Sequence, residues 1–558
     1  MNGQQRKPIG PFLKDMAPGH CASASPFAEW IRLFLKSLAC FICVAPLQAQ
    51  APPDLPKEIR LLEAIRLTLQ SDPQIQIQEK QIQVSQGISR QAAGAFDWTM
   101  ETALSQGLVR TPRTEFERFQ LGSFTNAANL VEDITHYRLG LRKQFRSGIA
   151  VSPGFEATRI ADNLDRDRAL NRANVNLVIH IPLLKNFGTD ATGAFERAAR
   201  ISAEAATLEF QHTIANRLLN ATTAFWNLLA ARRQLEILHG SEARASNLVV
   251  RVQDLVNAGE FPGAELEHVR ADFAEKSAAT VAGAQRLVAA RQTFGLALGL
   301  SPGQLNSTPL PADAFPETPG LIAPGLFQNP KFLEQSLQRR ADYLASLKNE
   351  SAAEVLLAAA QKNLKPTLDL ELEVGYAGLM EGSQFQRYYS SLDPRNSGGL
   401  NAFGSLRFEW PFGNNAARGL WLQRQGVLDQ TRLRTLELAR TISSSLHVAI
   451  SELIRAMEEF KNLQTAAGHF RAADENEKEK LRLGTTTVLD VITTADRLAN
   501  AQLNAVAGQA RVAGAVARLR YELGLLVAAG ADRDITLREE DFITLPPENV
   551  LEAGTTRP

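Results

Sequence analysis

The chain has 558 residues and carries 60 lysine and arginine side chains against 60 aspartate and glutamate side chains. A formal net charge of zero provides no basic surface for nucleic acid, so we expect no nucleic-acid partner. Hydrophobic residues make up 44% of the sequence, yet no run of eighteen apolar residues occurs, which argues against a membrane-spanning helix.

The first 49 residues are typical of an export signal. Arg32 and Lys36 come before a short apolar stretch over 37–47, which is too short to span a bilayer. Small residues at and just after Ala49 offer two cleavage sites. We therefore assign residues 1–49 to a signal peptide.

All three cysteines lie inside this predicted signal, at Cys21, Cys40 and Cys43. The pair Cys40 and Cys43 has the CxxC spacing of a redox or metal motif, but a discarded signal peptide explains it without any chemistry. An exported chain without cysteine has no disulfide, so its stability has to come from packing.

The sequence is internally duplicated. Residues 255–300 align without gaps with residues 480–525, and both segments run from a glycine turn to a Leu-Gly-Leu end. Residues 61–99 align in the same way with residues 329–367. Each half therefore predicts the same order of a short helix, a β region, a long helix and another short helix.

The two predicted repeats have matching parts. The first repeat covers 50–306, with a helix over 61–95, a β region over 97–182, and helices over 190–257 and 261–300. The second repeat covers 331–526, with a helix over 331–364, a β region over 366–411, and helices over 416–482 and 486–525. A Pro-rich linker over 307–330 joins them, and a tail over 527–558 follows.

The long predicted helices carry a heptad pattern. In the first of them, apolar residues follow a 4-3-4-3 spacing at Ile214, Leu218, Ala221, Phe225 and Leu228. At 1.5 Å per residue each long helix would reach roughly 100 Å, and two short helices placed end to end match that length. The pattern predicts a long helical bundle, and periodicity alone is also compatible with a soluble coiled-coil rod or scaffold.

The β regions predict strands with one apolar and one polar face. In the second half, leucines and a valine alternate with Asp369, Glu371 and Glu373, and a second alternating segment ends at Trp410. Such strands, with an aromatic residue near the end, are typical of a transmembrane barrel, which has to close into a ring. Two strands per half cannot close alone, so we expect several copies to share one barrel. An ordinary half-buried sheet is the alternative.

The first β region is longer than the second and contains an additional hairpin. Trp98 begins one predicted strand and Pro182 ends another. Between them, alternating residues run to a turn at Arg146–Gly148 and return. The sequence leaves open whether this hairpin, near 134–160, enters the barrel wall or extends outside it.

Several segments resemble the outer-membrane factors related to TolC. They are LLEAIRLTLQSDPQI from residue 61, AGAFDWT before the first strand, PLLKNFG at 182–188, FWNLLAARRQLE at 225–236 and LRLGTTTVLDVITTADRLANAQ at 481–502. The resemblance covers nearly all of the chain after the signal, including the duplication. Single motifs are moderately specific, but their order and spacing are strongly so.

The resemblance implies a mainly α-helical protein with a transmembrane β-barrel. It implies a homotrimer in outer-membrane lipid, in which the strands form one shared barrel and the duplicated helical hairpins form a periplasmic α-barrel. It also implies a passive efflux or type I secretion conduit in the bacterial outer membrane. A periplasmic adaptor and an inner-membrane pump are the implied partners, and the tail over 527–558 is expected in the periplasm.

The family places a lumenal carboxylate six residues after the glycine of the periplasmic turn. In this sequence Gly484 leads in this way to Asp490, and in the other half Gly259 leads to Glu265. The resemblance therefore implies rings of acids in a narrow throat, which would favour cations and repel one another. The other interpretation is that both acids occupy helix starts, where the helix dipole favours them.

The same turns are the expected adaptor contacts. A threonine after Gly484 can cap the following helix, and a proline suits the first turn of its counterpart. Thr493 stands where the family often has a second acid, and Thr486 where it often has a basic residue, which puts the cation site and the salt-bridge lock in doubt. The expected contact residues are Gly259, Pro262, Gly263, Gly484, Thr485, Thr486 and Thr487.

The sequence gives no support for an enzymatic function. It contains no HExxH and no Walker A segment, and the histidines after residue 49 are scattered. The methionines do not cluster either, so nothing indicates specialised metal export. We therefore expect no catalytic residue, no cofactor and no metal site. A periplasmic coiled-coil adaptor or scaffold without a pore is the alternative function. Such a protein would share the long helical hairpins, but it would lack the repeated β pattern.

Overall fold

The computed structural model describes residues 55–120, 128–163, 168–317, 330–384, 386–393, 395–527 and 537–546. The predicted signal peptide over 1–49, residues 318–329 of the predicted linker and most of the predicted tail lie outside the described residues. Within the described ranges, no helix is both long enough and apolar enough to cross a membrane.

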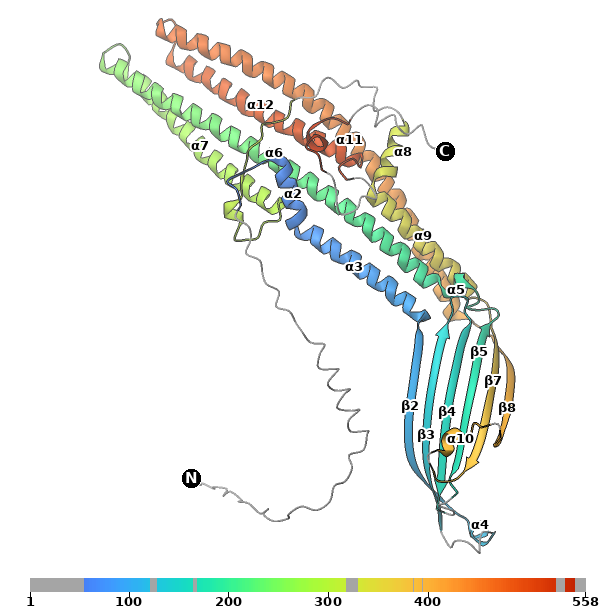
Figure 1. Cartoon of the computed structure of the whole chain (residues 1–558). Helices are drawn as coiled ribbons and strands as arrows, with labels where there is room; N and C mark the ends of the chain where they lie inside the picture. Colours follow the sequence, from blue (N-terminus) through green and yellow to red (C-terminus); the bar gives the residue numbers. More distant parts are fainter. Residues whose placement is uncertain are drawn as a thin grey trace, which may run out of the picture. The chain divides into compact units, whose positions relative to one another are not determined.

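Each half of the chain contains one long helix with shorter partners (Figure 1). In the first half the helices are α2 (Leu61–Ser71), α3 (Pro73–Ala93), α6 (Ala194–Asn257) and α7 (Gly263–Ala297). In the second half they are α8 (Pro330–Arg339), α9 (Ala341–Lys362), α11 (Asn415–Arg482) and α12 (Val488–Glu522). Both α3 and α7 pack along α6, and both α9 and α12 pack along α11, so short helices follow one another along each long one.

The first short helix of each half is divided in two, whereas the sequence predicts single helices over 61–95 and 331–364. In the first half the Asp72 side chain accepts hydrogen bonds from the backbone nitrogens of Gln74 and Ile75 and so caps α3. Pro73 is the first residue of α3, where its missing N–H is tolerated. In the second half Arg340 separates α8 from α9. Both single helices are therefore corrected to pairs.

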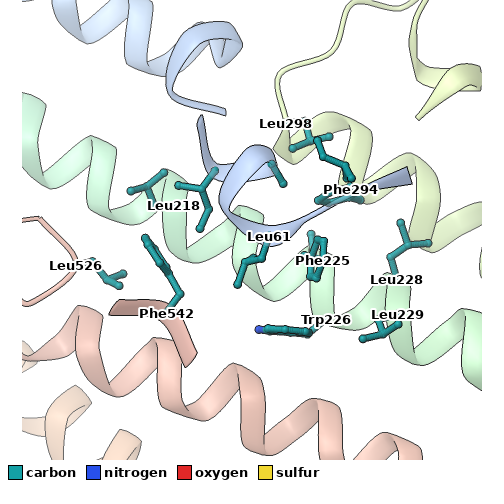
Figure 2. Packing of buried hydrophobic residues seen from close by; sticks show 14 of the residues in the cluster. Leu61, Leu218, Phe225, Trp226, Leu228, Leu229, Phe294, Leu298, Leu526 and Phe542 are labelled. Atoms are coloured by element: carbon teal, nitrogen blue, oxygen red, sulfur yellow. The ribbon is translucent and has the colours of Figure 1, made fainter. Parts of the chain in front are cut away.

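The main hydrophobic core lies where α2, α6 and α7 meet (Figure 2). Phe225 and Trp226 are fully buried, and their rings make an edge-to-face contact with centroids 5.0 Å apart. Phe294 of α7 packs on Phe225 at 5.8 Å, and Leu61 joins from α2. Burying each such side chain contributes roughly 1.5–3 kcal/mol. Phe542 of α13 (Glu540–Ile543) completes the cluster, so this part of the predicted tail packs against the first half.

The β regions form one six-stranded antiparallel sheet in the order β2-β3-β4-β5-β7-β8. Its strands are β2 (Trp98–Pro112), β3 (Asn129–Gln144), β4 (Ala150–Asp162), β5 (Leu170–Pro182), β7 (Thr367–Glu381) and β8 (Ser397–Glu409). The hairpin near 134–160, which the sequence could not place, forms β3 and β4 between β2 and β5. Minor elements are the parallel pair β1 (Glu58–Ile59) and β6 (Leu310–Pro311), and the short helices α4 (Glu115–Gln120), α5 (Thr189–Thr192) and α10 (Arg387–Ser390).

Candidate functional site

The register gives the sheet two chemically different faces. Directly opposed residues of antiparallel neighbours point to the same side of a sheet, so one row of residues can be followed across all six strands. That row consists of Thr102, Leu139, Phe155, Val175, Tyr376 and Leu400. We call the side that carries it the apolar face. Within the six strands, the exposed large hydrophobic side chains lie on this face, with Val109 and Phe403 as exceptions.

The opposite side, the polar face, carries charged and amide side chains that contact one another across neighbouring strands. Glu156 of β4 accepts a hydrogen bond from Arg138 of β3 at 2.9 Å and lies 3.1 Å from Nε2 of His136. Asn176 of β5 donates to Glu373 of β7 at 2.9 Å. A sheet with one face of this kind and one apolar face suits a boundary between water and an apolar medium.

The apolar face has a defined end on each side. Trp98, at the start of β2 beside the helices, is 57% exposed, and Trp410, directly after β8, is 59% exposed. Toward the other end, the connection between β7 and β8 folds onto the face, where Leu392 packs against the buried Ala157 and Ala173. Aromatic residues therefore border the apolar face on the side of the helices, and a loop covers part of it on the far side.

The turns that join α6 to α7 and α11 to α12 lie at the same end of the helices (Figure 1). Gly259 and Gly484 follow the long helices with φ of +79° and +71°, a conformation that L side chains rarely adopt. Pro262 directly precedes the first residue of α7, Gly263, one position earlier than the helical position expected for it. In the other turn Thr487 is the residue that caps α12.

Asp490 is tied into the start of α12. Its Oδ2 accepts hydrogen bonds from the Thr487 hydroxyl at 2.6 Å and from the Thr487 backbone nitrogen at 3.3 Å, while the Asp490 backbone nitrogen donates to the Thr487 hydroxyl at 3.2 Å. This is a reciprocal capping box. The hydrogen bonds from Thr487 lower the pKa of Asp490. Asp490 therefore caps α12 through contacts made within a single chain.

Thr486 connects Asp490 to a further acid that sequence reasoning missed, Glu477 of α11. The Thr486 hydroxyl lies within hydrogen-bond distance of Glu477 Oε1 and 3.3 Å from Asp490 Oδ2. Hydrogen bonds from Thr486 and Lys480 lower the pKa of Glu477. Glu477 lies two helical turns before Gly484, and this spacing was a signal in the sequence that could have drawn attention to it.

Glu265 lies in the first turn of α7 and is half-buried. The next residue, Leu266, belongs to a buried cluster that includes Val488 and Ile492 of α12. Apolar contacts therefore bring the starts of α7 and α12 together, and Glu265 and Asp490 lie on the two neighbouring hairpins.

An ion-pair network links the two hairpins farther from the turns. Lys276 of α7 pairs with Asp272 on its own helix at 3.3 Å and with Asp496 of α12. Burial acts against the ammonium, but the hydrogen bond to Asp496 and the attraction of Asp272 raise the pKa of Lys276. Burial also raises the pKa of Asp272, although Lys276 opposes it. A cavity of about 250 Å³, lined also by Arg244 and Arg251, adjoins the network.

No known protein-family profile and no curated protein matches the sequence. The CmeC outer membrane channel of Campylobacter jejuni matches the structure with a TM-score of 0.64 at 12% identity, over 88% of this chain and 92% of that chain. The outer membrane protein VceC of Vibrio cholerae matches with a TM-score of 0.60 at 15% identity, over 83% of this chain and 96% of that chain. The MtrE outer membrane channel of Neisseria gonorrhoeae matches with a TM-score of 0.55 at 12% identity, over 83% and 89%. The chain therefore has the fold of these outer-membrane proteins, and its resemblance to TolC-like outer-membrane factors is confirmed at the level of the fold.

Proposed function

We propose that this chain is the outer-membrane channel subunit of a tripartite efflux or type I secretion system. It is a passive conduit from the periplasm to the exterior, gated by coiled helices at its periplasmic end. The observation that carries this proposal is the six-stranded sheet with one apolar and one polar face. The fold shared with solved outer-membrane channels supports it.

The dimensions of the apolar face fit the outer membrane. The apolar residues of β7 run from Leu368 to Tyr376, a segment of nine residues. A transmembrane β-strand tilted by about 45° needs about 9–11 residues to cross the apolar core of a membrane. Lipid cannot satisfy unpaired backbone groups, so the sheet has to close with other copies, and a homotrimer with one shared barrel meets that demand.

The helical hairpins form the periplasmic α-barrel in this proposal, and their turns meet the adaptor that connects the channel to an inner-membrane pump. Pro262→Arg and Thr485→Arg add charge and bulk at the two turns without changing the left-handed glycines. We expect either substitution to abolish crosslinking to the adaptor and to stop transport. Val281→Arg, at a position 70% exposed in the middle of α7, is the matched control. If both Pro262→Arg and Thr485→Arg left adaptor crosslinking and transport intact, the proposed contact between the turns and the adaptor would be contradicted.

In this proposal the carboxylates of the gate are those of Asp490 and Glu265. Three chains would bring three copies of each acid to the narrow end of the channel, where clustered carboxylates attract cations. The contact of Leu266 with Val488 supports this arrangement, because it holds the starts of α7 and α12 side by side.

Membrane fractionation tests the proposed function directly. We expect the protein in the outer membrane as a heat-resistant trimer that conducts ions in a planar bilayer. Recovery as a soluble periplasmic monomer would sink the proposal and support the coiled-coil adaptor or scaffold instead.

A further inference from the structure

We propose that all six strands of each chain enter the membrane wall, with β8 of one copy paired to β2 of the next, so that three copies form an eighteen-stranded ring. The inference deepens the proposed function and rests on it, because the outer-membrane trimer is its premise. Its interaction surface is the pair of free edges of the sheet, and the partner is a second copy of this chain.

The β3–β4 hairpin is built as a part of the wall. β3 pairs with β2 over fifteen residue pairs, and β4 pairs with β5 over eleven. Its side chains also continue the two faces of the neighbouring strands. Leu139 and Phe155 lie on the apolar face, and Arg138 and Glu156 lie on the polar face. A hairpin that projected out of the membrane would need neither the full-length pairing nor the apolar side.

The two edge strands are suited to pair with each other across copies. Within the described residues, β2 and β8 each have a strand neighbour on one side only. They run in opposite directions and contain 15 and 13 residues. Even-numbered residues of both strands, such as Leu104 and Leu400, lie on the apolar face. Antiparallel pairing of β8 with β2 of the next copy therefore continues both faces around the ring.

The six strands of one chain are too few to close into a barrel by themselves. Outer-membrane barrels have at least about eight strands, and even eight leave an interior that side chains fill. Unpaired backbone groups in hydrocarbon cost several kcal/mol each, so open edges of this length are excluded as well. Barrel diameter grows roughly in proportion to strand number, so eighteen strands give a pore about one and a half times as wide as the twelve-stranded ring that four strands per chain would make.

Cysteine crosslinking tests the pairing between copies, because residues 55–558 contain no cysteine of their own. Strands of a closed barrel are tilted, so the register is staggered between copies. Trp98 and Trp410 both mark the helix-side border of the apolar face, which places Thr102 of one copy near Leu406 of the next. Thr102→Cys is therefore combined in turn with Gly404→Cys, Leu406→Cys and Phe408→Cys on the apolar face, and with Ser405→Cys and Arg407→Cys on the polar face as matched controls. We expect oxidation to give covalent dimers and trimers for one apolar-face pair and none for the polar-face pairs. Crosslinks confined to single chains, or crosslinks in none of the pairs, would overturn the proposal.

A second pair of variants tests whether the hairpin lies inside the wall. Thr102 and Leu139 are directly opposed, whereas two strands separate Thr102 from Val175. We expect Thr102→Cys to crosslink with Leu139→Cys and not with Val175→Cys. Crosslinking to Val175→Cys in a protein that still inserts and conducts would place the hairpin outside the ring. The proposed function would survive that result, whereas the absence of any outer-membrane trimer would remove both.

Deleting the hairpin tests the width of the pore. Replacing residues 113–168 with a short turn joins β2 to β5, keeps the strands antiparallel and leaves four strands per chain. We expect the largest neutral polymer that enters from the exterior side to shrink in diameter by about one third. An unchanged size limit in a deletion variant that forms trimers would contradict the eighteen-stranded ring, and the crosslinks in the full chain decide the matter if the deletion variant does not assemble.

Discussion

The backbone of Gly299 lies against Asp72 at the break between α2 and α3, so closely that a Cβ on Gly299 would be 2.6 Å from the Asp72 backbone nitrogen. Gly299 also has a φ of +75°. Its counterpart in the second half, Gly524, has a φ of +67°, and a Cβ on it would be 3.0 Å from the backbone of Arg339. The two halves therefore share one joint, in which the end of α7 or α12 enters the break in the short helix of its own half.

Replacing Gly299 with alanine should lower the free energy of unfolding by about 2–4 kcal/mol, because it adds a clash to a strained conformation. Unfolding in denaturant, followed by circular dichroism, measures the loss. Gly259→Ala is the matched control, since Gly259 has a φ of +79° but nothing within 4 Å of its Cβ position. It should show the strain alone, about 1 kcal/mol. Equal losses in the two variants would contradict the close packing.

Lys276→Met should loosen the contact between α7 and α12. It leaves the Asp272 and Asp496 carboxylates, whose side chains are 11% and 34% exposed, without the cation between them. We expect a loss of about 1–3 kcal/mol in the free energy of unfolding and a larger conductance of the channel at rest. The control is Arg482→Met, which breaks a pair with Glu479 whose side chains are 72% and 56% exposed, and it should change stability by less than about 1 kcal/mol. The same loss in both variants would argue against a link between the hairpins.

The start of α12 should respond to acid. The folded-state pKa of Asp490 is lowered, so its stabilising effect is present above the ordinary pKa of aspartate, about 4, and is lost as the pH falls through the lower folded pKa. Hydrogen exchange of the backbone amides in the first turn of α12 should therefore accelerate several-fold beyond its intrinsic pH dependence in this window. In Asp490→Asn the amides should be less protected at neutral pH and show no such step. A step that persists in this variant would assign the titration to another group.

Substitutions at Asp490 and Thr487 can distinguish a role of Asp490 in capping α12 from a role in the gate. Thr487→Val removes the hydroxyl that bonds Asp490 but keeps the carboxylate. If Asp490 lines the throat, Asp490→Asn should weaken block of the conductance by an added divalent cation by about tenfold, while Thr487→Val leaves it within about twofold. Equal effects of the two substitutions would limit Asp490 to capping the helix.

Arg340 should be among the residues least tolerant of truncation. Its guanidinium donates to Glu522 at 2.6 Å and to Asp342 at 2.8 Å, and the side chains of Arg340 and Glu522 are each 7% exposed. Arg340→Met leaves a buried carboxylate unpaired, so we expect a loss of about 3–5 kcal/mol in the free energy of unfolding. Adding Glu522→Gln to this variant should recover part of the loss. No recovery in the double variant would indicate that packing, not charge, dominates at this site.

Patterns local in sequence allowed much of the fold to be predicted. The alternation around Asp369 and Glu371 holds in the register, where Leu370 and Leu372 lie on the apolar face. The heptad seam holds as well, because Ile214, with its partners of the same spacing, is buried in α6. Both patterns need only the periods of a strand and a helix.

Contacts distant in sequence could not be predicted in this way. Alternation shows which side chains share a face of a strand but not which strand lies beside it, so the hairpin had no assigned place until the register was known. Lys276 and Asp496 are more than 200 residues apart, and only the packing of α7 against α12 joins them. The break at Arg340 has no proline to announce it, in contrast to the one at Asp72, where Pro73 follows directly.

Asp72 and Arg340 occupy equivalent places in the duplicated halves, and both are buried, yet they carry opposite charges. Asp72 lies 3.7 Å from Arg217 of the first half, whereas Arg340 pairs with Glu522 of the second. Six half-units around the proposed trimer would therefore repeat one backbone shape while their joints alternate in charge. If the two joints were exchanged, Asp72 would meet Glu522, and Arg340 would meet Arg217. Each exchange would bury two like charges, so the short helices of one half fit only the long helix and the end helix of that same half.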